Sequence, residues 1–307
     1  MRRKQRVRGP NVAPHYFCSA NGESNLIGYH GCFAWYELLT TDVAAAKAFY
    51  GDVLGWEARD ASTPDLSYTL LAAGKVPTCG VMELPEEGRK MGARPRWMGY
   101  VGVDDIEVTA GRIKRLGGSV FVPPTDTNIG CISVVADPQT AIFALVARLK
   151  FSHQQPLEAA KPGRVGWHEL LAADWEKAFA FYGEIFGWQK PHTEISAKEH
   201  YHPFSACGLT IGGMFTRHPS DPPPFWLLYF NVEDIQAAEE RVKVAGGEVF
   251  PNPVEMPGGT SIARCADPQG AAFALQGRQS QTSKLGWSTE WSGFSSKGRL
   301  VGQKPRG

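Results

Sequence analysis

Two stretches of the sequence decide the fold because they are nearly the same. Residues 35–42 read WYELLTTD, and residues 167–174 read WHELLAAD. The match continues downstream at the same offset of 132: Phe49-Tyr50-Gly51 with Phe181-Tyr182-Gly183, Gly55-Trp56 with Gly187-Trp188, and Gly80-Val81-Met82 with Gly212-Gly213-Met214. Dispersed matches with a nearly constant offset are the mark of an internal repeat. The chain is therefore predicted to consist of two homologous modules.

The repeat also sets the domain boundaries. Near its end, Asp137-Pro138-Gln139 matches Asp267-Pro268-Gln269, and the last match is Phe143-Ala144-Leu145 with Phe273-Ala274-Leu275. We assign the modules to residues 30–148 and 163–278, with a proline-containing linker at 149–162. The flanking segments 1–29 and 279–307 are polar and basic and have no apolar periodicity. We expect both tails to be disordered.

Each module repeats a smaller pattern. Residues 33–40 are apolar and favour a strand. Asp42 is placed to cap a following helix whose apolar residues recur at helical spacing, and Gly55 is placed to end it. Short strand-like segments follow, and the strand–helix order then begins again at Trp97 and Asp105. The prediction is an α+β protein in which every module holds two β-α-β-β-β units.

Composition and charge exclude several classes of protein. The chain has 307 residues, enough for about two domains, and its net charge is +1. The first 27 residues and residues 279–307 each carry +4, which leaves −7 for the modules and argues against nucleic-acid binding there. No apolar run reaches the ~20 residues of a membrane span. The six cysteines are scattered, so we expect reduced, apolar side chains and a cytoplasmic location.

The repeated motif resembles one known group of proteins. It reads D-x-x-x-A-x-x-F-Y-G-x-x-x-G-W over 42–56 and again over 174–188, with V-D-D-I or V-E-D-I before the second helix and D-P-Q before the last strand. This pattern is similar to the vicinal oxygen chelate superfamily, which includes glyoxalase I, bleomycin-resistance proteins and extradiol dioxygenases. The W-x-E-L opening looks most like tandem two-module members described as glyoxalases or hydroxylases. The resemblance covers both modules and leaves out the tails.

The resemblance implies a fold and a kind of ligand. In such proteins, paired β-α-β-β-β units curl into an open half-barrel cleft that holds a small molecule. For this chain it implies a pseudo-dimer within one polypeptide, present as a monomer or a weak homodimer. It implies neither a nucleic-acid partner nor a membrane.

The resemblance also implies a divalent metal, but the ligand positions do not carry metal ligands. By the family pattern, the first ligand falls at Trp35 and Trp167, the second near Met98 and Leu227, and the third at Ala144 and Ala274. Indole, thioether and alkyl groups cannot replace imidazole or carboxylate at such an ion. We therefore predict no metal site and no cofactor, and a dication is implied by the resemblance alone.

The candidate site residues follow from strand alternation. Glu37 and Glu169 lie two residues after Trp35 and Trp167, so each shares their face of the strand. A carboxyl group among apolar walls could act as an acid, a base or a hydrogen-bonding group for a ligand, and these two are our candidate catalytic residues. The alternative is a structural Glu that pairs with a backbone donor or an Arg. The candidate ligand-binding residues are Trp35, Trp56, Trp97, Tyr100, Trp167, Trp188, Trp226 and Tyr229, for which core packing is the alternative.

Three functions remain open from the sequence. The first is a metal-free protein that binds a small organic molecule in Trp- and Glu-lined clefts. The second is a glyoxalase-type lyase, or a dioxygenase or hydroxylase, that uses unfamiliar ligands such as Glu37 and Glu169 or general acid/base catalysis. The third is a structural or regulatory scaffold whose clefts are filled by its own aromatic side chains. Signatures for acyl transfer, phosphoryl transfer and dinucleotide binding are absent from the sequence.

Overall fold

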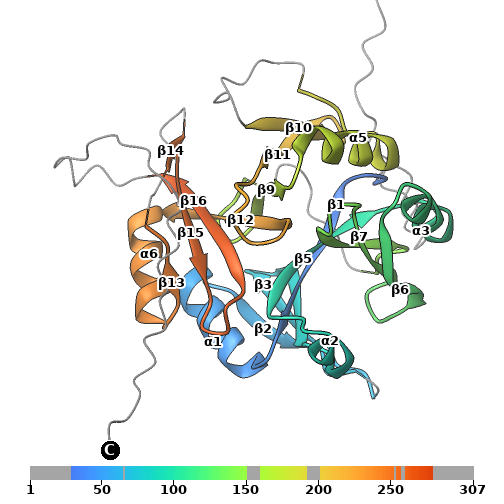
Figure 1. The fold of residues 1–307 in the computed structure, drawn as a ribbon. Coiled ribbons are helices and arrows are strands. Elements are labelled where there is room, and N and C mark those ends of the chain that lie inside the picture. Colours follow the sequence, from blue (N-terminus) through green and yellow to red (C-terminus); the bar gives the residue numbers. More distant parts are fainter. Residues whose placement is uncertain are drawn as a thin grey trace, which may run out of the picture.

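The structure is a computed structural model that describes residues 29–64, 66–150, 160–191, 201–251, 254–256 and 260–278. Residues 1–28, 151–159 and 279–307 lie outside this range, so the expectations for both tails and for most of the linker remain predictions. The two predicted modules correspond to two separate sheets (Figure 1).

The first module is built on a sheet of eight strands. Its strands follow the order β2-β3-β4-β1-β5-β8-β7-β6, with β1 parallel to β4 and antiparallel to β5. The elements are β1 (Phe33–Thr40), α1 (Val43–Leu54), β2 (Glu57–Asp60), β3 (Thr69–Ala73), β4 (Val76–Glu83), α2 (Glu86–Lys90), β5 (Arg96–Gly102), α3 (Ile106–Arg115), β6 (Ser119–Asp126), β7 (Cys131–Ala136) and β8 (Ile142–Ala147).

The second module repeats this topology. Its path is β10-β11-β9-β12-β16-β15-β13, and β14 pairs with β15 off the path. The elements are β9 (Val165–Ala172), α5 (Trp175–Phe186), β10 (His202–Ala206), β11 (Leu209–Thr216), β12 (Phe225–Asp234), α6 (Ile235–Val244), β13 (Glu248–Val249), β14 (Val254–Met256), β15 (Thr260–Ala266) and β16 (Ala272–Arg278). The strand that carries the repeated motif lies inside each sheet, β1 between β4 and β5, and β9 between β11 and β12.

The residues that the sequence predicts to cap the helices lie at the helix ends in the structure. The side chain of Asp42 accepts a hydrogen bond from the Ala45 backbone N–H at 2.9 Å, and Asp174 accepts from Lys177 in the same way at 3.1 Å. Gly55 and Gly187 end these helices at φ 69° and 71°, the left-handed region that disfavours side chains with a Cβ. Asp105 and Asp234 cap α3 and α6. The repeated motif therefore encodes the same helix in both modules.

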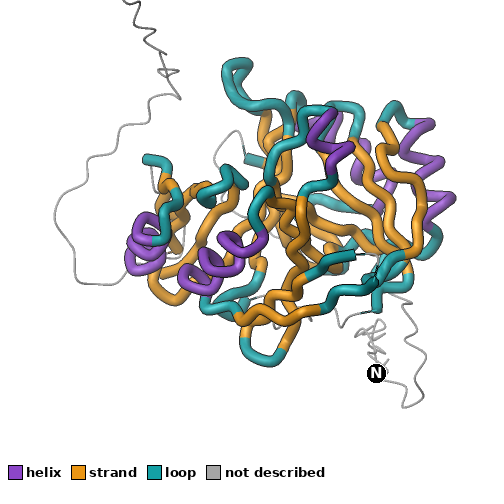
Figure 2. The backbone as a smooth tube through the Cα atoms, turned by 90° about the horizontal axis from the view of Figure 1, so that it is seen from below, coloured by secondary structure: helices purple, strands orange, loops and turns teal. Residues whose placement is uncertain are grey.

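The helices pack between the modules. Helix α1 of the first module contacts α6 of the second, and α3 of the first contacts α5 of the second (Figure 1). Figure 2 shows the same grouping from below, with one pair of helices at the left and the other helical segments at the upper right. Each group lies in an apolar core to which both modules contribute: Phe49, Tyr50 and Val53 with Val242, Phe273 and Leu275, and Ile113, Phe143 and Leu145 with Phe181, Tyr182 and Phe186. The two modules therefore share their cores.

Two series of hydrogen-bonded side chains link the modules, one in each core. Trp97 Nε1 donates to the Tyr50 hydroxyl at 2.8 Å, and Tyr50 donates to the Asp267 carboxylate of the other module at 3.1 Å. The counterpart chain, related by the repeat, runs from Trp226 through Tyr182 to Asp137 with distances of 3.1 Å. The Tyr of F-Y-G and the Asp of D-P-Q thus meet in space. Both motifs are explained by the contact between modules.

Two residues at equivalent positions of the repeat meet where the modules contact each other. Tyr36 and His168 occupy the same position in the two modules, and the Tyr36 hydroxyl lies 2.8 Å from His168 Nε2. His168 Nδ1 lies 2.8 Å from the Ile211 carbonyl oxygen, which can only accept, so Nδ1 carries the proton and Nε2 accepts from Tyr36. Burial lowers the pKa of His168 to about 4. A neutral imidazole therefore links the modules at their approximate two-fold axis.

The prediction that all cysteines are reduced is wrong for two of them. Cys32 and Cys207 form a disulfide with a Cα–Cα distance of 5.9 Å, joining the start of the first module to the β10–β11 hairpin of the second. The spacing of the cysteines in the sequence could not reveal this pair, because the two residues come from different modules and meet only where the modules pack together. Cys79, Cys131 and Cys265 are buried and unbonded, as predicted, and Cys18 lies outside the described residues.

Candidate functional site

The candidate site lies on the face of each sheet that the helices leave uncovered, which we call the open face. In β1, Tyr36 and Leu38 point into the shared core, whereas Trp35 belongs to a separate cluster on the open face. Strand alternation places Glu37 with Trp35. The neighbouring strands align Tyr100 with Trp35 and Met98 with Glu37, and Ala144 lies beside Tyr100. The side chains predicted from the family pattern therefore share one face.

Four side chains of the first module form a continuous hydrogen-bonded set. Trp35 Nε1 donates to the Tyr68 hydroxyl at 3.1 Å, and Tyr68 donates to Glu37 Oε1 at 2.8 Å. Tyr100 donates to Glu37 Oε2 at 2.5 Å. Both carboxylate oxygens are thus engaged, and Glu37 is 4% exposed. Burial raises the pKa of Glu37, and the two hydroxyl groups oppose that rise by stabilising the carboxylate.

A glycine makes room for this set. A Cβ at Gly80 would lie 1.8 Å from the Tyr68 hydroxyl oxygen, well inside van der Waals contact. Gly80 pairs with Glu37 in the parallel ladder between β1 and β4. The phenol of Tyr68 can therefore lie against β4 and reach the carboxylate on the adjacent strand only because residue 80 has no side chain.

The second module uses the same residues. Trp167 Nε1 donates to the Tyr201 hydroxyl at 2.6 Å. A Cβ at Gly213 would lie 2.3 Å from the Tyr201 ring, and Gly213 pairs with Glu169. Tyr229 is aligned with Trp167 on the opposite neighbouring strand. Trp, Tyr, Glu and Tyr thus recur on both open faces, each set with its glycine.

The structure corrects the alignment of the repeat at this point. The sequence comparison set Gly80 against Gly212, but the ladder pairs Glu37 with Gly80 and Glu169 with Gly213. The true offset is 133 here, and it also relates Tyr68 to Tyr201. Sequence reasoning missed these two tyrosines because they lie in weakly matching segments. The recurrence of a Tyr about twelve residues before a glycine was the only available signal.

The two sets differ in their ionic partner. Arg264 Nη2 donates to Glu169 Oε1 at 2.7 Å, and β15 brings Arg264 into register with Ala274. In the first module the residue in register with Ala144 is Val134, which has no charge. Glu37 is therefore held by two hydroxyl groups, whereas Glu169 forms an ion pair.

The two sets also differ in exposure. Trp35, Tyr68 and Tyr100 are 2%, 1% and 2% exposed, so the set of the first module is closed to solvent. In the second module, Glu169 and Tyr229 are buried, but Trp167 and Tyr201 are only partly buried. The Arg264 side chain is 34% exposed. The second open face therefore presents more of its polar and aromatic groups to solvent.

Comparisons with known proteins agree with this arrangement. Residues 164–275 match the model of the "Glyoxalase/Bleomycin resistance protein/Dioxygenase superfamily", and residues 35–146 match a "Glyoxalase-like domain". A protein of Mycobacterium bovis described as "Putative glyoxylase CFP32" is 30% identical over 244 residues, which cover 78% of this chain and 92% of the relative. The chain belongs to the glyoxalase/bleomycin resistance/dioxygenase superfamily.

Other known proteins resemble parts of the chain or its fold. The anthracycline biosynthesis protein DnrV of Streptomyces peucetius is 33% identical over 129 residues, covering 37% of this chain and 46% of that protein. The Mn(II)-bound glyoxalase of Novosphingobium aromaticivorans aligns with a TM-score of 0.56 at 15% identity, covering 80% of this chain and 81% of that one. The 2,3-dioxygenase LapB of Pseudomonas sp. KL28 aligns at 0.55 with 12% identity, covering 80% and 91%. At these identities the solved structures support the fold alone.

The open faces do not fit the metal of the superfamily. The residues at the three expected ligand positions, Trp35, Met98 and Ala144, lie together in an apolar cluster, and Trp167, Leu227 and Ala274 form its counterpart. None of them offers a ligand for a divalent ion. Among the described residues, no group of three His, Cys, Asp or Glu side chains is arranged to hold a metal ion.

Four of the predicted ligand-binding residues lie elsewhere. Trp97 and Trp226 are at the opposite strand parity from Tyr100 and Tyr229, and they supply the chains that end at Asp267 and Asp137. Trp56 Nε1 donates to the Gly163 carbonyl at 2.8 Å, and Trp188 Nε1 donates to that of Gly31 at 2.7 Å. All four indoles are buried in the shared cores, so we leave them out of the candidate site. It consists of Trp35, Tyr68, Glu37 and Tyr100 with their counterparts, and Arg264.

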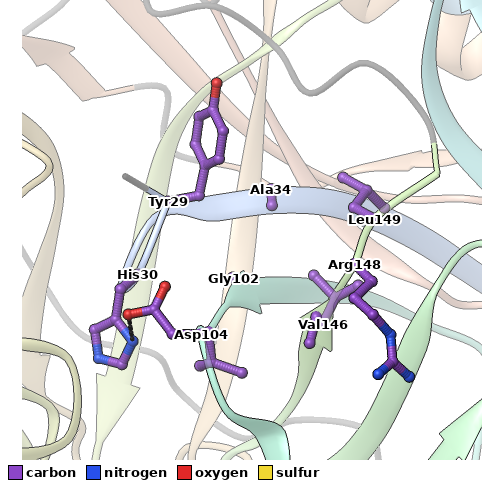
Figure 3. Close-up of a pocket in the computed structure, with 10 residues that line it drawn as sticks. Tyr29, His30, Ala34, Gly102, Asp104, Val146, Arg148 and Leu149 are labelled. Carbon is purple, nitrogen blue, oxygen red and sulfur yellow. Dashed lines mark ion pairs between the residues drawn. The ribbon is translucent and has the colours of Figure 1, made fainter. Parts of the chain in front are cut away.

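Two cavities lie outside these sets. One, of about 20 Å³, is lined at the ends of β1, β5 and β8, where His30 Nδ1 lies 3.7 Å from an Asp104 carboxylate oxygen (Figure 3). It has room for about one water molecule. The other, of about 300 Å³, lies beside the β10–β11 hairpin and is lined by polar residues that include Lys190 and Cys207. Neither is lined by a residue of the Trp–Tyr–Glu–Tyr sets.

Proposed function

We propose that this superfamily member binds a small organic molecule on the open face of its second module, without the divalent metal of the family. The observation that carries the proposal is the contrast between two equivalent sets. The first is closed, with every member at most 4% exposed, whereas the second has partly exposed Trp167, Tyr201 and Arg264. Aromatic walls with a few converging polar groups are typical of small-molecule sites.

The first module has a different role in this proposal. Its set satisfies both oxygens of Glu37 internally and keeps Trp35 from solvent. That matches the filled-cleft alternative, in which the aromatic side chains stabilise the sheet. We therefore assign binding to Glu169, Trp167, Tyr201 and Tyr229, and a structural role to Glu37.

The enzymatic alternative rests on family resemblance and on one feature of the chain. Burial raises the pKa of Glu37, as expected of an acid–base group, but its oxygens already accept two hydroxyl groups. A glyoxalase-type or oxygenase reaction through a bound metal would also need a group of at least three metal ligands, which the described residues of neither open face provide. The expected cytoplasmic location stays a prediction, and the Cys32–Cys207 bond removes the argument from cysteine usage that supported it.

Native mass spectrometry of the freshly purified full chain tests the proposal. We expect one retained organic mass per chain, lost on denaturation, and well under one dication per chain by elemental analysis. The matched variants are Tyr201→Phe, which should weaken retention, and Tyr68→Phe, which should not. Two equivalent ligands per chain, a chelator-resistant dication in each module, or no retained molecule would each contradict the proposal.

A further inference from the structure

The cation of the second open face points to the chemistry of its ligand. Arg264 lies in one row across the sheet with Ala274, Tyr229 and Trp167, because β15, β16, β12 and β9 are neighbours in register. The same row in the first module is Val134, Ala144, Tyr100 and Trp35. The two rows differ mainly by one guanidinium group, which is thus a feature of the second module and not of the shared fold.

The side chains of this row offer more hydrogen-bond donors than acceptors. Arg264 uses Nη2 for Glu169, but its Nε is buried and makes no hydrogen bond within the described part of the chain. The Tyr229 hydroxyl is also buried, but it lies close enough to both Glu169 and Arg264 to interact with them. A buried donor without an acceptor is destabilising. The unpaired Arg264 Nε on this row favours a ligand group that offers acceptor oxygens.

The guanidinium group remains charged in this environment. Burial alone would lower the pKa of Arg264, but the Glu169 carboxylate and Tyr229 outweigh it and hold the pKa above its ordinary value. Arg presents a planar fork of donors that matches a carboxylate, and a charge-assisted pair is stronger than a neutral hydrogen bond. Since a third of the side chain is exposed, a ligand can reach the guanidinium from solvent.

The surroundings of the guanidinium are aromatic and apolar. Arg264 Cζ lies 5.8 Å from the centre of the Phe215 ring, and the Tyr201 ring lies 6.4 Å from that of Phe215. Leu171 and Ile262 belong to the same open-face cluster. This surface suits a flat or apolar body attached to the anionic group.

We propose that the second open face takes an organic acid, with the carboxylate on the partly exposed guanidinium of Arg264 and an aromatic or apolar body against Phe215 and Trp167. Glu169 holds the guanidinium in place and is the one carboxylate of the described residues that pairs with it. This inference rests on the proposed function, because it names the ligand class of the same face.

The test compares acids with their neutral amides on the full chain. The probes are benzoate and benzamide, phenylacetate and phenylacetamide, and indole-3-acetate and indole-3-acetamide, titrated by saturation-transfer NMR. At least one acid should bind roughly ten- to a hundredfold more tightly than its amide, the range of a charge-assisted hydrogen bond. Arg264→Gln should abolish this preference, so that the dissociation constants of the acid and of its amide come within about a factor of two of each other.

Two further variants keep the result interpretable. Glu169→Gln/Arg264→Gln removes both charges and avoids a buried unpaired carboxylate, so it serves if Arg264→Gln fails to fold. Arg148→Gln breaks an exposed pair with Asp126 in the first module, at 2.6 Å, and should keep the preference for the acid.

The outcomes separate the two proposals. If acid and amide bind alike, or if the preference survives in the variants at Arg264, the organic-acid assignment is overturned while binding on this face stands. If none of the six probes binds, or if all bind equally well to Tyr201→Phe, the proposed function fails as well.

Discussion

At the scale of single residues, His168 makes stability depend on pH. Its folded-state pKa of about 4 is below the ordinary value of 6.5, so the unfolded chain binds the proton first as pH falls. The neutral His168 side chain therefore contributes to the free energy of unfolding in full above about pH 6.5. This contribution is lost as pH falls toward 4, and the loss amounts to at most about 3 kcal/mol. We expect urea unfolding between pH 7.5 and 4 to show this loss. His168→Gln should flatten that part of the profile, and parallel profiles would contradict the assignment.

Glu37 provides a second prediction at this scale. Its two oxygens accept from Tyr68 and Tyr100, and Gln offers only one acceptor oxygen of the same shape. Glu37→Gln should therefore fold and lower the free energy of unfolding by about 1–3 kcal/mol. Glu57→Gln is the control, because Glu57 is exposed on β2 and its pair with Arg59 is solvated. Equal stability of both variants in urea would refute a structural role for Glu37.

At the scale of elements, the contact between β4 and Tyr68 depends on Gly80. Gly80→Ala places a methyl group on the hydroxyl of Tyr68 and must displace the phenol from Glu37. We expect a loss of about 1–3 kcal/mol, the range for overpacking a core. In a Tyr68→Ala background the same substitution should cost far less, since neighbouring sites are not additive. Gly51→Ala, where the nearest atom is 3.5 Å away, should not destabilise the chain.

The helices and strands also show which parts of the structure could be predicted from the sequence. The strand at 33–40, the Asp-capped helices and the face shared by Trp35 and Glu37 follow from local patterns, and the structure confirms these placements. Tyr68, Tyr201 and Arg264 could not be found in this way. They reach the two Glu residues only through pairing between strands. No single segment of the sequence determines the register of that pairing. Trp97 was grouped with Tyr100 although their strand parity differs.

At the scale of the whole molecule, the modules depend on one another. The apolar faces of α1 and α6 lie in one core, and those of α3 and α5 in the other. An isolated module would expose these faces, and the buried hydroxyl of Tyr50 or Tyr182 would lose its carboxylate acceptor. We therefore expect neither module to be stable as an isolated monomer, because the area it buries must offset the conformational entropy of folding.

Separate expression of residues 30–148 and 163–278 tests this dependence. Because the modules are equivalent by repeat, each can cover its exposed helices with a second copy of itself or with the other module. We expect each alone to be unfolded or a homodimer by sedimentation and circular dichroism, and an equimolar mixture to form a 1:1 complex. The mixture should unfold at a higher temperature than either part, because only it restores the Tyr50–Asp267 and Tyr182–Asp137 contacts. A monomeric module that unfolds cooperatively near the temperature of the full chain would show that the shared cores are not needed.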